Sequence, residues 1–129
     1  MGELKDERHV LFVDDEEDLL VASEALLKRL GFKVTGVTSG ADALAALSRA
    51  PDAFDVLVTD LFMPGMDGRA LIEQVRIIRA DMPVVLLSGM GDAIDQDVLD
   101  ALAPVRVMGK PVRRDDLANA IRQAMEESR

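Results

Sequence analysis

Short apolar segments alternate with amphipathic segments along almost the whole chain, and this alternation constrains the fold more than any other feature of the sequence. The first apolar segment, His9 to Val13, is a continuous run without clear polar alternation. Such a run is typical of a strand buried on both faces of a parallel sheet. Equivalent segments predict further strands at 32–37, 54–59, 84–87 and 105–108.

The segments between these strands have the apolar spacing of helices. From Glu16 to Leu30, apolar side chains recur every three or four residues, and Gly31 supplies a C-terminal stop. The same pattern predicts helices at 41–49, 69–79, 92–102 and 113–127. Strands and helices in this alternation predict an α/β fold, a doubly wound parallel sheet with helices on both faces and right-handed crossovers.

The size and composition of the chain fit one folded domain. With 129 residues, of which 49% are hydrophobic, the chain can bury a core but has no room for a second, output domain. We expect the folded domain to span 9–127, with 1–8 as an N-terminal extension or the remnant of a linker. The chain has no cysteine, which excludes disulfides and thiolate metal sites.

The hydropathy and charge of the chain exclude two classes of partner. The longest apolar runs, such as Met82 to Leu87, are far shorter than the roughly 20 residues that span a bilayer, and the N-terminus is too charged for a signal peptide. We therefore expect a cytoplasmic protein that does not contact a membrane. The net charge of -9 argues against direct nucleic-acid binding, because phosphate contacts need clustered Lys and Arg.

An uninterrupted acidic run, residues 14–18, follows the first predicted strand. Carboxylates gathered at a strand end suit a hard cation such as Mg²⁺. Acidic residues also favour the positive end of the helix dipole, and Asp is a common helix N-cap. The run alone does not decide between a cation site and an ordinary helix start.

Polar side chains follow four of the predicted strands. Asp14 and Asp15 follow the first strand, Asp60 the third, Ser88 the fourth, and Lys110 comes shortly after the fifth. In a doubly wound sheet ligands bind at the carboxyl ends of the strands, so we expect these groups to converge on one site. Each residue alone has an ordinary explanation as a turn, loop or solvated residue, but their joint placement does not.

This set of groups suits phosphoryl transfer to an aspartate. Three close carboxylates repel one another and favour binding of Mg²⁺. Asp60 is the predicted nucleophile because it sits at the end of the central strand and a carboxylate can form an aspartyl phosphate. Lys110, the Ser88 hydroxyl and Mg²⁺ would then compensate the charge on the phosphoryl oxygens.

Four segments make residues 8–127 resemble the receiver domain of bacterial two-component response regulators. They are Val10-Leu-Phe-Val-Asp-Asp-Glu16, Val56-Leu-Val-Thr-Asp-Leu-Phe-Met-Pro-Gly-Met-Asp-Gly68, Val84-Val-Leu-Leu-Ser-Gly89 and Gly109-Lys-Pro111. The second segment, joined to the other three in this order, is highly specific. The run Lys110-Pro-Val-Arg-Arg-Asp-Asp-Leu117 and the start of the first segment are also similar to receivers at the C-terminus of hybrid histidine kinases.

The resemblance implies a flavodoxin-like (βα)5 fold with strand order 2-1-3-4-5 and a function in His-Asp phosphorelay signalling. Asp60 would accept a phosphoryl group from the phosphohistidine of a histidine kinase or a phosphotransfer protein. In a hybrid kinase this partner lies in the same polypeptide. The domain would catalyse only its own phosphorylation and dephosphorylation, and the face formed by 92–127 either mediates homodimers or stays exposed to solvent.

The resemblance also implies a metal-ligand set. Asp15 and Asp60 would ligate Mg²⁺ directly, together with the backbone carbonyl of Phe62. Asp14 would act mainly through water. Phe62 and Met90 match positions that line the route of water to the phosphoryl group, so we expect both side chains to alter the rate of hydrolysis.

The residues of the switch match the family only in part. Lys110 would pair with the acceptor and then with the phosphoryl group, Ser88 would move toward that group, and the Lys110–Pro111 bond would be cis. Three residues before Lys110, however, the family usually has Tyr or Phe, whereas this chain has Val107, and Val112 stands where Phe is more usual. Without a ring to bury, the signal is expected to pass by backbone or loop movement.

Other classes of protein explain the sequence less well. Mg²⁺-dependent phosphatases resembling the haloacid dehalogenases carry a second acid two residues after the nucleophile, where this chain has Phe62. A degenerate receiver that serves only as an interaction module would lack the acceptor or a metal ligand, and none is missing. A nucleotide-binding protein is disfavoured because no Gly-rich loop ending in Gly-Lys-Ser/Thr follows the first strand.

Overall fold

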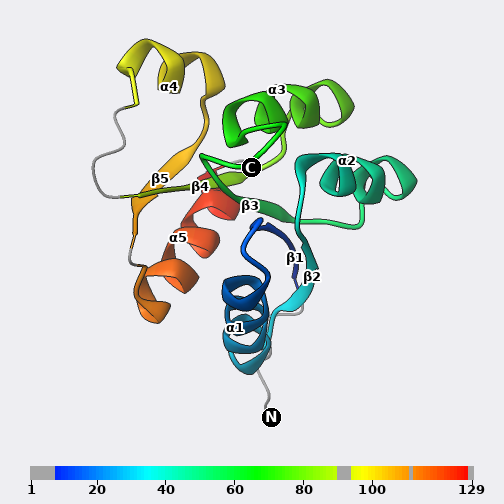
Figure 1. Ribbon diagram of the computed structural model, residues 1–129, viewed down its shortest axis with the longest axis vertical. Coiled ribbons are helices and arrows are strands. Elements are labelled where there is room, and N and C mark those ends of the chain that lie inside the picture. Colours follow the sequence, from blue (N-terminus) through cyan, green and yellow to red (C-terminus); the bar gives the residue numbers. More distant parts are fainter. Residues whose placement is uncertain (1–7, 90–93, 111, 128–129) are drawn as a thin grey trace.

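A five-stranded parallel sheet forms the centre of the molecule in the computed structural model, which describes residues 8–89, 94–110 and 112–127 (Figure 1). The sheet has the order β2-β1-β3-β4-β5, which confirms the predicted doubly wound, flavodoxin-like topology. The strands are β1 (His9–Val13), β2 (Lys33–Val37), β3 (Val56–Asp60), β4 (Val84–Ser88) and β5 (Arg106–Gly109). The helices are α1 (Glu17–Arg29), α2 (Gly40–Arg49), α3 (Gly68–Ile78), α4 (Gln96–Leu102) and α5 (Arg114–Glu127).

Two hydrophobic cores lie on opposite faces of this sheet, because successive strand residues point to opposite sides. Val10 and Phe12 of β1 pack in the core formed with α1 and α5. Leu11 and Val13 pack in the core formed with α2, α3 and α4. Figure 1 shows α1 and α5 below the sheet and α2 and α3 above it. Burial on both faces explains why the strand sequences are continuous apolar runs.

Local signals fix the ends of the helices. At the end of α1, Gly31 has a φ of 99° and its amide donates to the carbonyl of Lys28, which confirms the predicted stop. The helix predicted from Asp92 begins only at Gln96, because Asp95 is extended and its carboxylate accepts a hydrogen bond from the amide of Asp97. Asp92 itself lies outside the described residues.

The topology places the carboxyl ends of β1 and β3 at the switch point of the sheet. From β1 the chain crosses to β2 on one side, whereas β3, β4 and β5 extend on the other side. Ligands of doubly wound folds bind in the crevice at this point.

Within the described part of the chain, every helix is too short or too polar to span a bilayer. The domain boundary predicted after residue 8 stays a prediction.

Candidate functional site

The four strand ends bring the predicted site residues together at one edge of the sheet. Asp60 and Ser88 are the last residues of β3 and β4, and both are buried. Asp14 is buried directly after β1, whereas Asp15 is exposed. Lys110 follows β5, and its amide donates to the carbonyl of Ser88 at 2.7 Å. The predicted convergence is therefore confirmed for these residues.

Backbone contacts hold the acidic turn after β1. The amide of Asp14 donates to the carbonyl of Val37 at 3.1 Å, which extends the pairing of β1 with β2 by one residue. The Asp14 carboxylate then accepts a hydrogen bond from the amide of Glu16 at 2.9 Å. This side-chain contact forms a tight turn at the start of α1. Asp14 is thus fixed in the interior while the chain turns outward at Asp15.

A glycine allows the amino end of α3 to pack against the acceptor strand. A Cβ atom on Gly68 would lie 2.3 Å from the carbonyl oxygen of Asp60, so no side chain fits there. The amide of Gly68 donates to the carbonyl of Leu61 at 2.7 Å. Asp67 caps the helix by accepting a hydrogen bond from the amide of Ala70 at 2.9 Å. Because of these contacts, α3 supports the backbone of Asp60 directly.

The sequence pattern alone did not reveal this support. Asp67-Gly68 is also a common turn dipeptide, so the pair by itself favours a turn as much as the start of a helix. Its position directly before a helical apolar pattern is the signal that identifies Asp67 as an N-cap.

The charges at the site are unbalanced. Carboxylate oxygens of Asp14, Asp15 and Asp60 lie within 4.8 Å of one another, and the Lys110 ammonium lies 2.5 Å from an oxygen of Asp60. Burial raises the pKa of Asp60 to about 7. The hydrogen bond with Asp14 and the negative charge of Asp14 also raise this pKa, whereas Lys110 lowers it. Burial would lower the pKa of Lys110, but its pairing with Asp60 raises that pKa above the ordinary value.

This donor set fits a hard divalent cation. Mg²⁺ prefers oxygen ligands and typically binds one or two carboxylates with water and phosphate oxygens. Three carboxylates share the site with one ammonium, so a cation would relieve their repulsion. The exposed position of Asp15 leaves access from solvent. The arrangement can bind a cation next to a buried, lysine-paired carboxylate, which is the geometry needed for an aspartate acceptor.

Comparison with known proteins decides the family. The model of the response regulator receiver domain matches residues 10–122. The chain belongs to this family. Receiver domains are the phosphoacceptors of two-component signal transduction, and this function applies to the chain.

The relatives of this receiver domain agree with the assignment. The C4-dicarboxylate transport transcriptional regulatory protein DctD of Rhizobium meliloti is 35% identical over 93% of this chain, which spans only 26% of that protein. A receiver domain protein of Clostridium thermocellum has a TM-score of 0.85 with 29% identity, covering 93% of this chain and 95% of its own. A receiver protein of Sinorhizobium medicae has a TM-score of 0.83 with 31% identity, covering 96% and 98%.

The switch region of this receiver domain has no aromatic side chain on β5. Val107 pairs with Leu86 of β4 and is 39% exposed. Val112 packs against the core formed with α1 and α5. The predicted cis bond between Lys110 and Pro111 lies outside the described residues, because Pro111 is not among them.

Phe62 differs from the other phenylalanines of the receiver domain. Its side chain is 63% exposed, whereas Phe12, Phe32 and Phe54 are buried in the two cores. The chain has four Phe and no Tyr or Trp, and Phe62 is the one exposed Phe among the four. Met90, the other residue predicted to control water access, lies outside the described residues.

Proposed function

We propose that Asp60 is the phosphoacceptor of this receiver domain. Among the three clustered carboxylates, Asp60 is the one that is both buried and paired with Lys110, and this observation carries the assignment. The donor would be a phosphohistidine of a histidine kinase or a phosphotransfer protein. A carboxylate oxygen of Asp60 attacks phosphorus, the new O–P bond forms, and the P–N bond to the imidazole breaks.

The neighbouring residues have distinct roles in this proposal. Asp15, Asp60 and the backbone carbonyl of Phe62 would hold Mg²⁺, with Asp14 acting through water. When bound, the cation neutralises part of the charge on the phosphoryl oxygens. Lys110 transfers its ion pair from the carboxylate to the phosphoryl group, as its distance of 2.5 Å from Asp60 allows.

Ser88 and Val107 define the switch. The Ser88 hydroxyl would turn toward the new phosphoryl group, and Val107 would not respond as an aromatic side chain would, because it has no ring to bury. The proposed signal passes through the main-chain hydrogen bond that the amide of Lys110 donates to the carbonyl of Ser88. Phe62 stands where a phosphatase with an Asp-x-Asp motif has its second acid, so the domain would catalyse only its own phosphorylation and dephosphorylation.

The family and the charge of the chain support a proposal for its cellular setting. We place the domain in the cytoplasm, without direct nucleic-acid binding because the net charge is -9. It would act alone or as part of a longer protein such as a hybrid histidine kinase. The face built from 92–127 is a candidate surface for homodimers.

Intact mass measurement tests the acceptor assignment. The native chain is incubated with acetyl phosphate, with and without Mg²⁺. Two variants are treated in the same way: Asp60→Asn, and the control Asp81→Asn, whose carboxylate is exposed in the connection between α3 and β4. We expect one added phosphoryl group on the native chain and on Asp81→Asn, only with Mg²⁺, and none on Asp60→Asn. A native chain that gains no phosphoryl group from acetyl phosphate or a phosphorylated kinase would contradict the proposal.

Phe62 would control how long the phosphoryl group survives. An exposed aromatic side chain beside the acceptor shapes the access of water, so Phe62→Asn should change the rate of hydrolysis severalfold. The decay of phosphorylated protein is followed by mass measurement after the donor is removed. Ile77→Asn is the control, because Ile77 is an exposed apolar residue of α3 outside the site. An unchanged lifetime in Phe62→Asn would remove this role.

A further inference from the structure

One arginine of α3 binds the backbone where α4 ends and β5 approaches. The Nη1 atom of Arg76 donates to the carbonyl oxygens of Leu102 at 2.6 Å and Ala103 at 2.9 Å. Its Nη2 atom donates to Pro104 at 2.5 Å and more weakly to Met82 at 3.4 Å. A single half-buried guanidinium therefore joins α3, the end of α4 and the segment before β4.

The helix α4 has few anchors besides this contact: Leu102 is buried in the core and Val98 packs against it. It is seven residues long, has no basic residue in its last turn and buries only Leu102 fully. The last carbonyls of a helix lack partners within the helix and carry partial negative charge, so a cation there is stabilising. Short helices are marginal without tertiary contacts. Arg76 supplies this cation from the neighbouring helix, at the end of α4 where Leu102 is buried.

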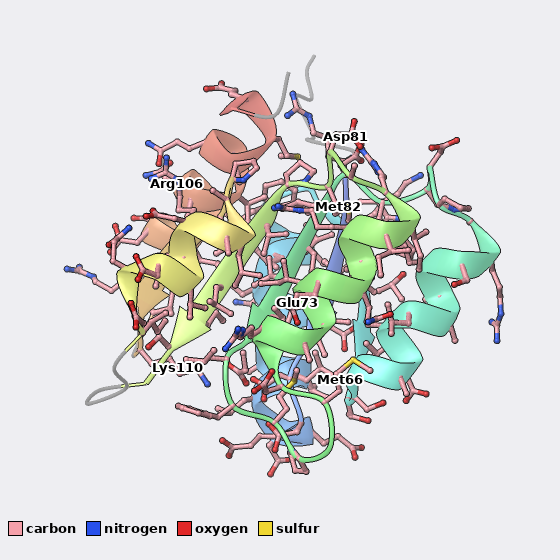
Figure 2. The ribbon with its side chains drawn as sticks, turned by 90° about the horizontal axis from the view of Figure 1, so that it is seen from above. Met66, Glu73, Asp81, Met82, Arg106 and Lys110 are labelled. Atoms are coloured by element: carbon pink, nitrogen blue, oxygen red, sulfur yellow. The ribbon has the colours of Figure 1, made fainter. Side chains whose placement is uncertain are left out.

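The contact lies at the edge of the sheet opposite the acceptor site. Figure 2 shows Met82 and Arg106, which flank the starts of β4 and β5, at one end and Lys110 at the other. A strand of five residues such as β4 separates the two edges by about 15 Å. The carboxyl end of α4 is thus bound by Arg76, whereas its amino end is the end nearer to Ser88 in the sequence.

We propose that Arg76 is a positioning residue that clamps the carboxyl end of α4, so that phosphorylation makes α4 pivot about this end instead of moving as a whole. The pivot rests on the proposed function, since it requires Ser88 to respond to phosphorylation of Asp60. It also supplies a route for the signal in a chain that has Val107 where an aromatic side chain would otherwise be buried. The clamp alone is independent of phosphorylation.

Amide hydrogen exchange measured by NMR tests the clamp in the resting protein. Arg76→Gln is compared with Arg79→Gln. Arg79 is a matched control because it follows the last residue of the same helix, and its guanidinium binds the carbonyls of Phe54 and Pro51 and not α4. Thermal unfolding checks that each variant folds. If Arg76→Gln does not fold, Arg76→Lys is used in its place. We expect exchange at Leu102 and Ala103 to rise roughly tenfold in the Arg76 variant only. Equal effects of both substitutions, or none, would overturn the clamp.

A second experiment tests the pivot, with Mg²⁺ and beryllofluoride as a stable analogue of the phosphoryl group. In the native chain and in Arg79→Gln, chemical shifts should change at Val98 and Leu99 but not at Leu102. In Arg76→Gln the changes should extend to Leu102 and Arg106. Uniform changes along α4 of the native chain would overturn the pivot. A native chain that does not respond would overturn the proposed function and the pivot with it, while the clamp is decided by the first experiment.

Discussion

Asp60 has an environment that suits a reactive residue but lowers the stability of the folded domain. The side chain is 3% exposed, lies beside Asp14 and has one cationic partner, Lys110. A carboxylate buried among other acids is unfavourable in its charged form, which is why its pKa rises. A pKa raised by burial and a neighbouring charge is typical of functional sites. The residue that we assign as acceptor should therefore weaken the domain when no cation is bound.

The raised pKa of Asp60 predicts the sign of the pH dependence of the domain's stability. The pKa of Asp60 is raised from 3.8 to about 7 in the folded state, so the folded protein binds the proton more tightly than the unfolded chain. Stability should then fall as the pH rises through this range. In EDTA at pH 8, Asp60→Asn should be more stable than the native chain by on the order of 1–3 kcal/mol, and the difference should shrink toward pH 4. Urea unfolding of both proteins, with Asp81→Asn as control, measures this. An Asp60→Asn variant less stable than the native chain at pH 8 would refute it.

Gly68 provides a second prediction at the residue scale. A methyl group there would meet the backbone of Asp60, which cannot move without disturbing β3. Gly68→Ala should lose about 2 kcal/mol or more of unfolding free energy and react more slowly with acetyl phosphate. Gly109→Ala, at the same edge of the sheet but with open space at its Cβ, should change stability by less than about 0.5 kcal/mol. Similar losses in both variants, measured by urea unfolding, would show that the contact does not matter.

At the scale of elements, the N-caps of α2 and α3 should contribute equally to stability but differently to phosphorylation. Ser39 caps α2 and Asp67 caps α3, each by accepting a hydrogen bond from a main-chain amide of the first turn. Replacing either by Ala should cost about 1 kcal/mol. Only Asp67→Ala should also slow phosphorylation, because α3 begins against the backbone of Asp60. Unfolding in urea and intact mass after acetyl phosphate give the two readouts. Equal phosphorylation rates in both variants would contradict this coupling.

The sequence predicted the elements well where apolar spacing determined them. The strand His9–Val13 has the predicted bounds, and the other strands differ by only one or two residues at their ends. The shorter α4 was not predicted, because Ile94 continues the apolar spacing of the helix although it precedes the cap at Asp95. Spacing shows which face is apolar, whereas the first residue of a helix depends on capping contacts.

At the scale of the whole molecule, topology determined how much of the site was predictable. Strand ends converge in a doubly wound sheet whatever the side chains, so Asp14, Asp60, Ser88 and Lys110 could be placed together from the sequence. The contact between Arg76 and the end of α4 could not, because it joins residues 26 positions apart through side-chain packing. The burial of Asp14 and exposure of Asp15 likewise depend on the local turn.

Locating the phosphoryl group on the chain tests the central claim most directly. The native chain is treated with acetyl phosphate and Mg²⁺, then with sodium borohydride, which reduces an aspartyl phosphate to homoserine, and its peptides are analysed by mass spectrometry. We predict homoserine at position 60 and unmodified aspartate at Asp14 and Asp15, because only Asp60 is both buried and paired with Lys110. Homoserine at position 14 or 15, or at none of the three, would contradict the assignment of Asp60 as the acceptor.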